Sequence, residues 1–133
     1  MTRRQAREQA FIIIFEKSFQ DDLTVEEIID NAVEAGVLEK EDFSESLSKT
    51  VYENLEAVDK LIDENLVGWR KDRISKVSAS ILRLAISEIL YFTDIPNKVS
   101  VNEAVELAKT YAPTDDAAFI NGVLSSVLKK IGA

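Results

Sequence analysis

Three arginines close to the start of the chain are its clearest candidates for binding chemistry. Arg3, Arg4 and Arg7 lie within five consecutive positions. A guanidinium group binds phosphate oxygens through paired hydrogen bonds, so such a cluster favours a nucleic acid ligand. If this segment is helical, Arg4 and Arg7 lie along one face together with Phe11 and Phe15. The alternative, that these charges only solvate a helix face, stays open.

The net charge of −8 argues against a nucleic acid partner only if the charge is spread evenly, and it is not. Residues 20–68 hold fifteen acidic side chains and three lysines. Two short segments, 1–19 and 69–83, carry more basic than acidic side chains. Because phosphate binding depends on local clusters of Lys and Arg, basic segments can bind RNA beside a distant acidic surface.

Enzyme chemistry has little support in the sequence. The chain has no Cys and no His, which excludes disulfides, thiolate metal sites and the Ser–His and Cys–His nucleophile pairs. The usual nucleotide-binding, hydrolase and zinc-protease motifs are also missing. The carboxylate pairs Glu103/Glu106 and Asp115/Asp116 are better explained by helix capping and solvation than by a hard cation. We therefore expect no catalytic residue, no metal and no cofactor.

The elements that must position these residues are helices. Apolar side chains recur at helical spacing, and no segment has the alternation of a strand. We expect helices over 3–19, from a capping box of Thr24 and Glu27 to Gly36, and over 43–66, where a break remains open. Further helices are expected over 74–92, from a second capping box of Ser100 and Glu103 to 111, and after an N-cap at Thr114. The predicted class is all-α.

The segment 74–92 is apolar around almost its whole circumference, which is typical of a helix packed on several sides. Glu88 lies in the same angular sector as Ile81 and Ala85, while Arg83 points nearly opposite. An unpaired buried charge is costly, so each of these side chains needs a partner or access to water. We interpret Glu88 as a buried, hydrogen-bonded carboxylate, since no second catalytic group is evident.

No apolar run approaches the length of about 20 residues that a membrane span needs. The N-terminal segment also lacks the apolar core and cleavage site of a secretory signal. We expect a cytoplasmic protein that does not enter a membrane.

Several motifs resemble those of one known family. They are Arg3-Arg4-x-Ala6-Arg7-Glu8, Ile81-Leu82-Arg83-Leu84-Ala85 with Glu88, IPNKVSVNEAVELAKTYAP from Ile95, and FINGVL from Phe119. In order and spacing they resemble the NusB family of transcription antitermination factors over essentially the whole chain.

The resemblance implies an all-α fold with two small helical bundles around a shared long central helix. It implies one domain, 1–133, with helical halves of about 1–68 and 69–133. The implied function is that of a non-catalytic adaptor, which binds the boxA element of nascent ribosomal RNA together with NusE, a small-subunit ribosomal protein. The pair joins an antitermination complex on RNA polymerase. Some relatives self-associate, so a homodimer remains open.

The resemblance also assigns roles to residues. RNA contacts fall on Arg3, Arg4, Arg7, Asp115 and Phe119, with Lys98 as an added phosphate contact, and NusE contacts fall on Phe15 and Ser78. Unstacked bases of single-stranded RNA lie on aromatic or guanidinium planes, which makes Phe119 a candidate platform. Core packing for Phe119, helix capping for Asp115 and burial for Phe15 are the alternatives.

Two other functions stay open. The same helical fold occurs as the N-terminal RNA-binding domain of RNA cytosine methyltransferases, although no cofactor-binding domain follows within this chain. The chain could also be a helical protein-interaction module without RNA binding. The segment from Arg70 to Lys76 either adds a basic surface or is simply solvated.

Overall fold

The structure, a computed structural model, describes residues 1–66 and 74–133. These residues form seven α-helices and no strand, which confirms the all-α prediction. The helices are α1 (Arg3–Lys17), α2 (Val25–Glu34), α3 (Asp42–Glu53), α4 (Leu55–Glu64), α5 (Lys76–Tyr91), α6 (Asn97–Tyr111) and α7 (Asp116–Ile131). The expected stop at Gly68 and most of the basic segment from Arg70 lie outside the described residues.

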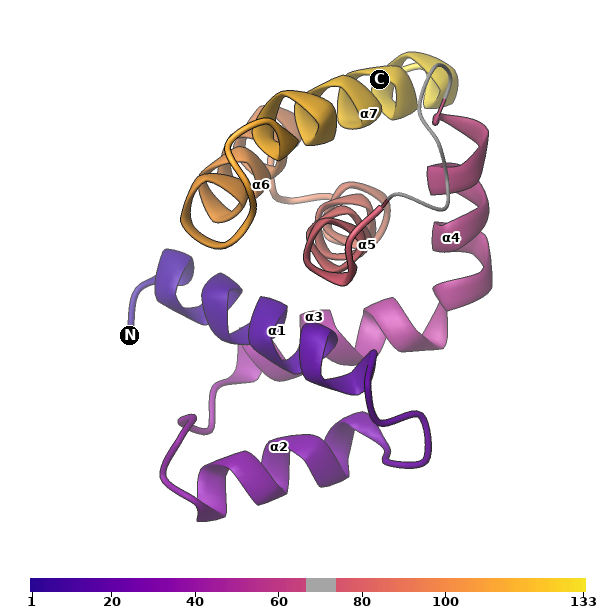
Figure 1. Ribbon diagram of the computed structural model, residues 1–133. Helices are drawn as coiled ribbons and strands as arrows, with labels where there is room; N and C mark the ends of the chain where they lie inside the picture. The colour runs from indigo at the N-terminus through magenta and orange to yellow at the C-terminus, as the bar shows by residue number, and fades with distance from the viewer. Residues whose placement is uncertain (67–73) are drawn as a thin grey trace.

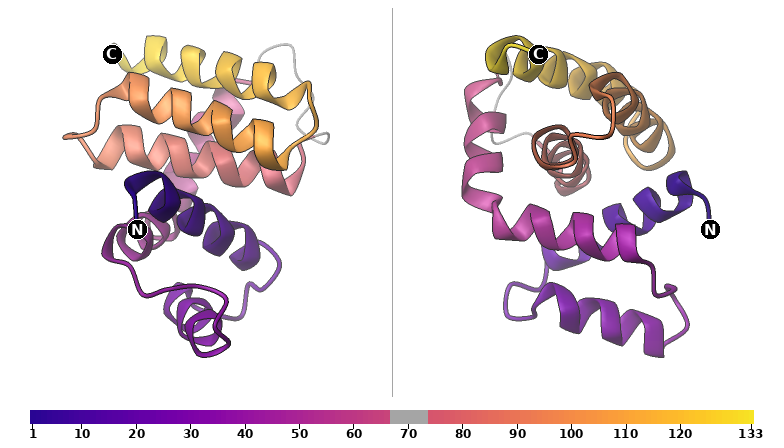
Figure 2. Two further views of the ribbon diagram at one scale, coloured as in Figure 1. Left: turned by 90° about the vertical axis from the view of Figure 1, so that its left-hand side faces the viewer. Right: turned by 180° about the vertical axis from the view of Figure 1, so that it is seen from behind.

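Helix α5 runs through the middle of the molecule. Figure 1 shows it nearly end on, surrounded by α1, α3, α4, α6 and α7. In Figure 2, α5, α6 and α7 lie side by side, and α1, α2 and α3 form a second group beneath them. Helix α2 packs on α1 and α3, outside this arrangement. The start of α1 therefore lies against the layer of α5 and α6.

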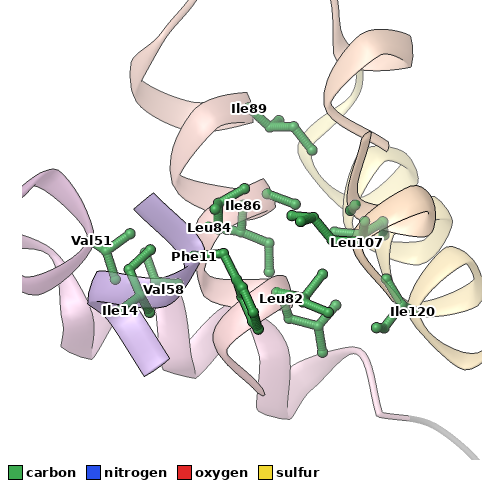
Figure 3. Close-up of a cluster of buried hydrophobic side chains, with 14 of the residues drawn as sticks. Phe11, Ile14, Val51, Val58, Leu82, Leu84, Ile86, Ile89, Leu107 and Ile120 are labelled. Atoms are coloured by element: carbon green, nitrogen blue, oxygen red, sulfur yellow. The ribbon is translucent and has the colours of Figure 1, made fainter. Parts of the chain in front are cut away.

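The burial of α5 on all sides explains its apolar sequence. Ile81, Leu82, Leu84 and Ile86 point in different directions, and each is fully buried. One continuous cluster joins them to side chains of α1, α3, α4, α6 and α7, as Figure 3 shows. A smaller cluster holds α2 against α1 and is made of Ile13, Val25, Ile28, Ile29 and Leu38.

The helix signals around α2 are confirmed. Thr24 Oγ1 accepts a hydrogen bond from the Glu27 amide at 3.1 Å, and the Glu27 carboxylate accepts one from the Thr24 amide at 3.0 Å. Gly36 follows the helix with φ 75°, the left-handed conformation that glycine adopts most easily. The expected helix over 43–66 is broken at Asn54, which separates α3 from α4.

Two predicted helix starts are wrong. Ser100 and Glu103 form no capping box, because α6 begins earlier, at Asn97, after Pro96 with φ −60° and ψ 138°. The side chains of Ser100 and Glu103 bind α5 and α1 instead. Thr114 is not the N-cap of α7 either: Asp115 holds that position, without a side-chain capping bond. None of the described helices is long and apolar enough to cross a membrane.

Candidate nucleic-acid interface

The candidate interface begins at the first turn of α1, which carries Arg3 and Arg4 and no acidic side chain. The N-terminus of a helix is the positive end of its dipole, so cations there are unfavourable and a bound anion is favourable. Thr2 and Gln5 cap this turn through reciprocal bonds of 3.1 and 2.8 Å. Helix α1 therefore begins with a capped first turn that carries two basic side chains and no acidic one, a charge pattern that favours a phosphate ligand.

Arg7 lies one turn further along α1 and is buried, with 4% of its side chain exposed. Its Nε and Nη2 donate to the two carboxylate oxygens of Glu88 at 2.8 and 3.0 Å. The hydroxyl of Ser100 donates to the same carboxylate at 2.7 Å. The interpretation of Glu88 as a buried, hydrogen-bonded carboxylate is thus confirmed, and its partner is an arginine that the sequence assigned to RNA.

Arg4 is exposed but bound by a carboxylate. Its Nε and Nη2 donate to Oε1 and Oε2 of Glu103 at 3.0 and 2.8 Å, while 71% of the Arg4 side chain remains exposed. The hydrogen bond and the charge of Glu103 raise the pKa of Arg4. Glu103 Oε1 also accepts from Nη1 of Arg7 at 3.2 Å. Two arginines and two glutamates thus form one network that joins α1, α5 and α6.

Arg3 uses its guanidinium differently. The group lies 3.9 Å from the ring centroid of Phe43 in α3, a cation–π contact, and the side chain is exposed. Within residues 1–66 and 74–133, Arg3 forms no ion pair. Of the three arginines, it is the one whose charge no described carboxylate neutralises by direct contact.

Two hollows adjoin Arg4. One, of about 210 Å³, lies between α1 and α6 and includes Arg7, Glu8 and Thr110 in its lining. The other, of about 450 Å³, lies between α6 and α7 and includes Asn102, Lys109 and Asn121. Glu103 lines both. A ligand could therefore reach the Arg4–Glu103 pair from either side.

The other residues assigned to RNA lie along the same pair of helices. Lys98 is exposed in the first turn of α6, and Asp115 is exposed just before α7. Phe119, one turn into α7, is only 7% exposed and packs in the main core. Arg4 contacts the middle of α6, between Lys98 at one end and Asp115 at the other. The exposed members thus lie at the start of α6, against its middle and beyond its end, whereas Arg7 and Phe119 are withdrawn from the surface.

Phe15, assigned to the protein partner, is half-buried in a row of aromatic rings along α1. Its ring centroid lies 6.0 Å from that of Phe11 and 5.0 Å from that of Phe19. Phe19 is 59% exposed, and the ammonium of Lys76 lies 4.9 Å from its ring. The exposed end of this row is an apolar surface that the sequence analysis did not single out.

Ser78, the second residue assigned to the partner, is 1% exposed. Its hydroxyl donates to Asp116 Oδ2 at 2.8 Å and so joins α5 to the first turn of α7. In this structure its side chain lies inside the fold, and only its neighbours reach the surface.

Glu103 is the main site residue that sequence reasoning missed. It was assigned to a capping box, whereas it binds two arginines. The sequence indicated only that Glu88 needs a partner or access to water, and the packing of α1 on α5 and α6 identifies its partner as Arg7, which in turn binds Glu103. Among the described residues, no group of three or more side chains could hold a metal ion.

Comparison with known proteins agrees with this fold. The family model of the NusB family matches residues 4–129. A transcription antitermination protein NusB of Listeria monocytogenes is 41% identical over 127 residues, which cover 96% of each chain. NusB of T. maritima superposes with a TM-score of 0.83 at 31% identity, over 98% of this chain and 92% of that one. The chain also superposes on a crystal structure of the antitermination factors NusB and NusE in complex with double-stranded RNA. The TM-score is 0.82 at 26% sequence identity, over 98% of this chain and 99% of that one. This chain belongs to the NusB family.

Proposed function

We propose that this chain is a transcription antitermination factor that binds RNA together with NusE and acts as a non-catalytic adaptor to RNA polymerase. The observation that carries the proposal is the match, over nearly the whole chain, to a NusB that forms a complex with NusE and RNA. The relatives named above are antitermination proteins. The place of action would be the cytoplasm, where bacterial transcription occurs.

The proposed RNA surface follows α6 from Lys98 through Arg4 to Asp115, with Arg3 beside it. Arg3, Arg4 and Lys98 supply phosphate contacts, and the positive end of α1 adds to them. Asp115 lies beside the RNA, next to Phe119. Arg7 supports this surface from within, because it holds Glu103 and Glu88 in place. We expect boxA-like single-stranded RNA to be the ligand.

The proposed NusE surface includes Phe15 and the region of Ser78. Phe15 supports the proposal because it is only partly buried and its ring contacts the exposed ring of Phe19. Ser78 would act indirectly, because it fixes Asp116 and with it the start of α7. The surface would lie beside the RNA surface, which suits a factor that binds both partners together.

Fluorescence anisotropy with a labelled boxA-like single strand tests this function, with and without the cognate NusE and over a salt series. We expect salt-sensitive binding that NusE strengthens, and weaker binding to a duplex of the same sequence.

Lys98→Ala should lower affinity and reduce the slope of log K against log salt by about 0.7, the loss of one phosphate contact. Lys129→Ala, an exposed lysine at the other end of α7, is the matched control.

A helical interaction module without RNA binding is the second candidate, because carboxylates inside the fold pair with two of the three arginines. A folded sample that binds NusE but no RNA at any salt concentration would establish this candidate and reject the first.

A further inference from the structure

We propose that Glu103 is an internal competitor for RNA phosphate at Arg4 and thereby limits the affinity of this chain for RNA. The inference rests on the proposed RNA binding and adds how the same site is regulated. A carboxylate and a phosphate both bind a guanidinium group through two parallel hydrogen bonds. Glu103 already makes both of these bonds with Arg4, at 3.0 and 2.8 Å.

The position of the pair makes the competition direct. The Arg4 side chain is 71% exposed, whereas that of Glu103 is only 13% exposed. The carboxylate is therefore held by the fold, and the guanidinium is the member that can turn towards a ligand. Hollows lie on both sides of the pair, so a phosphate can approach without moving the backbone.

Arg7 keeps the competitor in place. Its Nη1 donates to Glu103 Oε1 at 3.2 Å, and its two other donors are held by the buried Glu88. Within this network two positive and two negative side chains balance each other. RNA that binds Arg4 through Nε and Nη2 must first draw the guanidinium away from Glu103, and the carboxylate, still bound by Arg7, would then lie beside the phosphates.

Glu103→Gln tests the competition because it removes the charge and keeps the shape. The amide oxygen can still accept from Arg7, so the fold should be retained. We expect Glu103→Gln to bind boxA-like RNA about two- to fivefold more tightly than the wild type, which lies within the range of an exposed ion pair. Glu103→Asp keeps the charge but shortens the side chain, and it should fall between the two.

Two controls separate competition from a general effect of charge. Glu106 lies one turn further along α6, lines the same hollows and contacts Lys109 rather than Arg4. Glu106→Gln should therefore change affinity much less than Glu103→Gln. In an Arg4→Ala background the gain from Glu103→Gln should vanish, since the exposed guanidinium of Arg4 is gone and that of Arg7 stays buried against Glu88. An equal gain from Glu106→Gln, or a gain that persists without Arg4, would overturn the proposal.

The same variants titrated with inorganic polyphosphate keep this test independent of the RNA sequence. If no variant binds boxA-like RNA even with NusE, the proposed function fails, and the polyphosphate affinities still decide the role of Glu103. If the wild type binds RNA and Glu103→Gln binds neither ligand more tightly, the competition alone is rejected. Thermal unfolding of each variant verifies that the compared proteins are folded.

Discussion

Arg7 and Glu88 form the only buried ion pair among the described residues, and its geometry suits burial. Two parallel hydrogen bonds join the side chains, and Ser100 binds a carboxylate oxygen as well. Such a pair need not stabilise a fold more than apolar side chains would, but loss of one member leaves an uncompensated charge in the core. Arg7 is therefore a positioning residue of the fold, whatever its effect on RNA.

Replacement of Arg7 by methionine should lower the free energy of unfolding by about 3–5 kcal/mol, because the Glu88 carboxylate would be left buried without its cation. Urea unfolding followed by circular dichroism measures the change. Arg4→Met is the control, since the exposed Arg4 should leave the stability nearly unchanged. If Arg7→Met weakened RNA binding but unfolded at the wild-type urea concentration, Arg7 would be a direct RNA contact instead.

Serines of the two packed helices should respond in opposite ways to alanine. Ser100→Ala removes a hydrogen bond to a buried carboxylate and should cost about 1–3 kcal/mol. The hydroxyl of Ser87 in α5 is buried and has no hydrogen-bond partner among the described residues, so Ser87→Ala should be neutral or stabilising. Urea midpoints of both variants decide this, and equal destabilisation would contradict it.

The sequence predicted that Glu88 needs a partner, but it could not name Arg7. The two residues lie 81 positions apart, and only the packing of α1 on α5 brings them together. Arg4 and Arg7 look alike in a sequence, since both lie on one face of the first helix. Burial separates them, because Arg7 is one turn deeper along α1. The sequence similarly left open whether Phe119 is a platform for RNA bases or a core residue. In the structure its side chain packs in the core.

At the scale of the element, local signals predicted helices well where the cap was made by nearby residues. Thr24, Glu27 and Gly36 defined α2 in this way. Local signals failed at Ser100 and Glu103, because the side chains of these two residues make tertiary contacts instead of a helix cap. Asn121 and Gly122 lie within α7, although Asn-Gly is common in hairpin turns, because the apolar residues around them keep helical spacing.

Two glycines should respond oppositely to alanine because their backbones differ. Gly36 has φ 75°, so Gly36→Ala should destabilise the protein by about 1 kcal/mol through strain alone, as no atom lies within 4 Å of the added Cβ. Gly122 lies in α7 with the same open space, so Gly122→Ala should stabilise by about 0.5–1 kcal/mol. Thermal unfolding compares them, and a shared sign would contradict this account.

A hydrogen bond between α1 and α3 should make the free energy of unfolding fall at alkaline pH. The Tyr52 hydroxyl donates to the Ile14 carbonyl at 2.7 Å, and burial raises the pKa of Tyr52 despite the opposing effect of Arg83. A pKa higher in the folded than in the unfolded state contributes stability that is complete below about pH 10 and is lost as the pH rises further. Urea unfolding from pH 8 to 11 should show this loss in the wild type and a smaller one in Tyr52→Phe.

At the scale of the whole molecule, most of the acidic segment lies away from the candidate RNA surface, and Arg3 meets that segment at Phe43. The strongly acidic segment 20–68 supplies α2, α3 and α4, whereas the candidate RNA surface runs along α6 and the start of α1. Figure 1 shows α2 on the far side of α1 from α6 and α7. The overall charge of −8 therefore says little about the surface that meets RNA, because exposed charges are screened beyond about 8–10 Å at physiological salt.

The core predicts which parts of the molecule open together. One cluster spans α1 and α3 to α7, so residues on both sides of the boundary near 68 should unfold in one transition rather than as two halves.

Helix α2 is held by a much smaller cluster and should open first. Native-state hydrogen exchange should give α2 amides an opening free energy at least about 2 kcal/mol below that of α5 amides. Ile29→Ala should speed exchange chiefly in α2, whereas Leu84→Ala should speed it in α3 and α7 alike. Faster exchange in α7 than in α3 for Leu84→Ala would instead mean that the two halves fold as separate units.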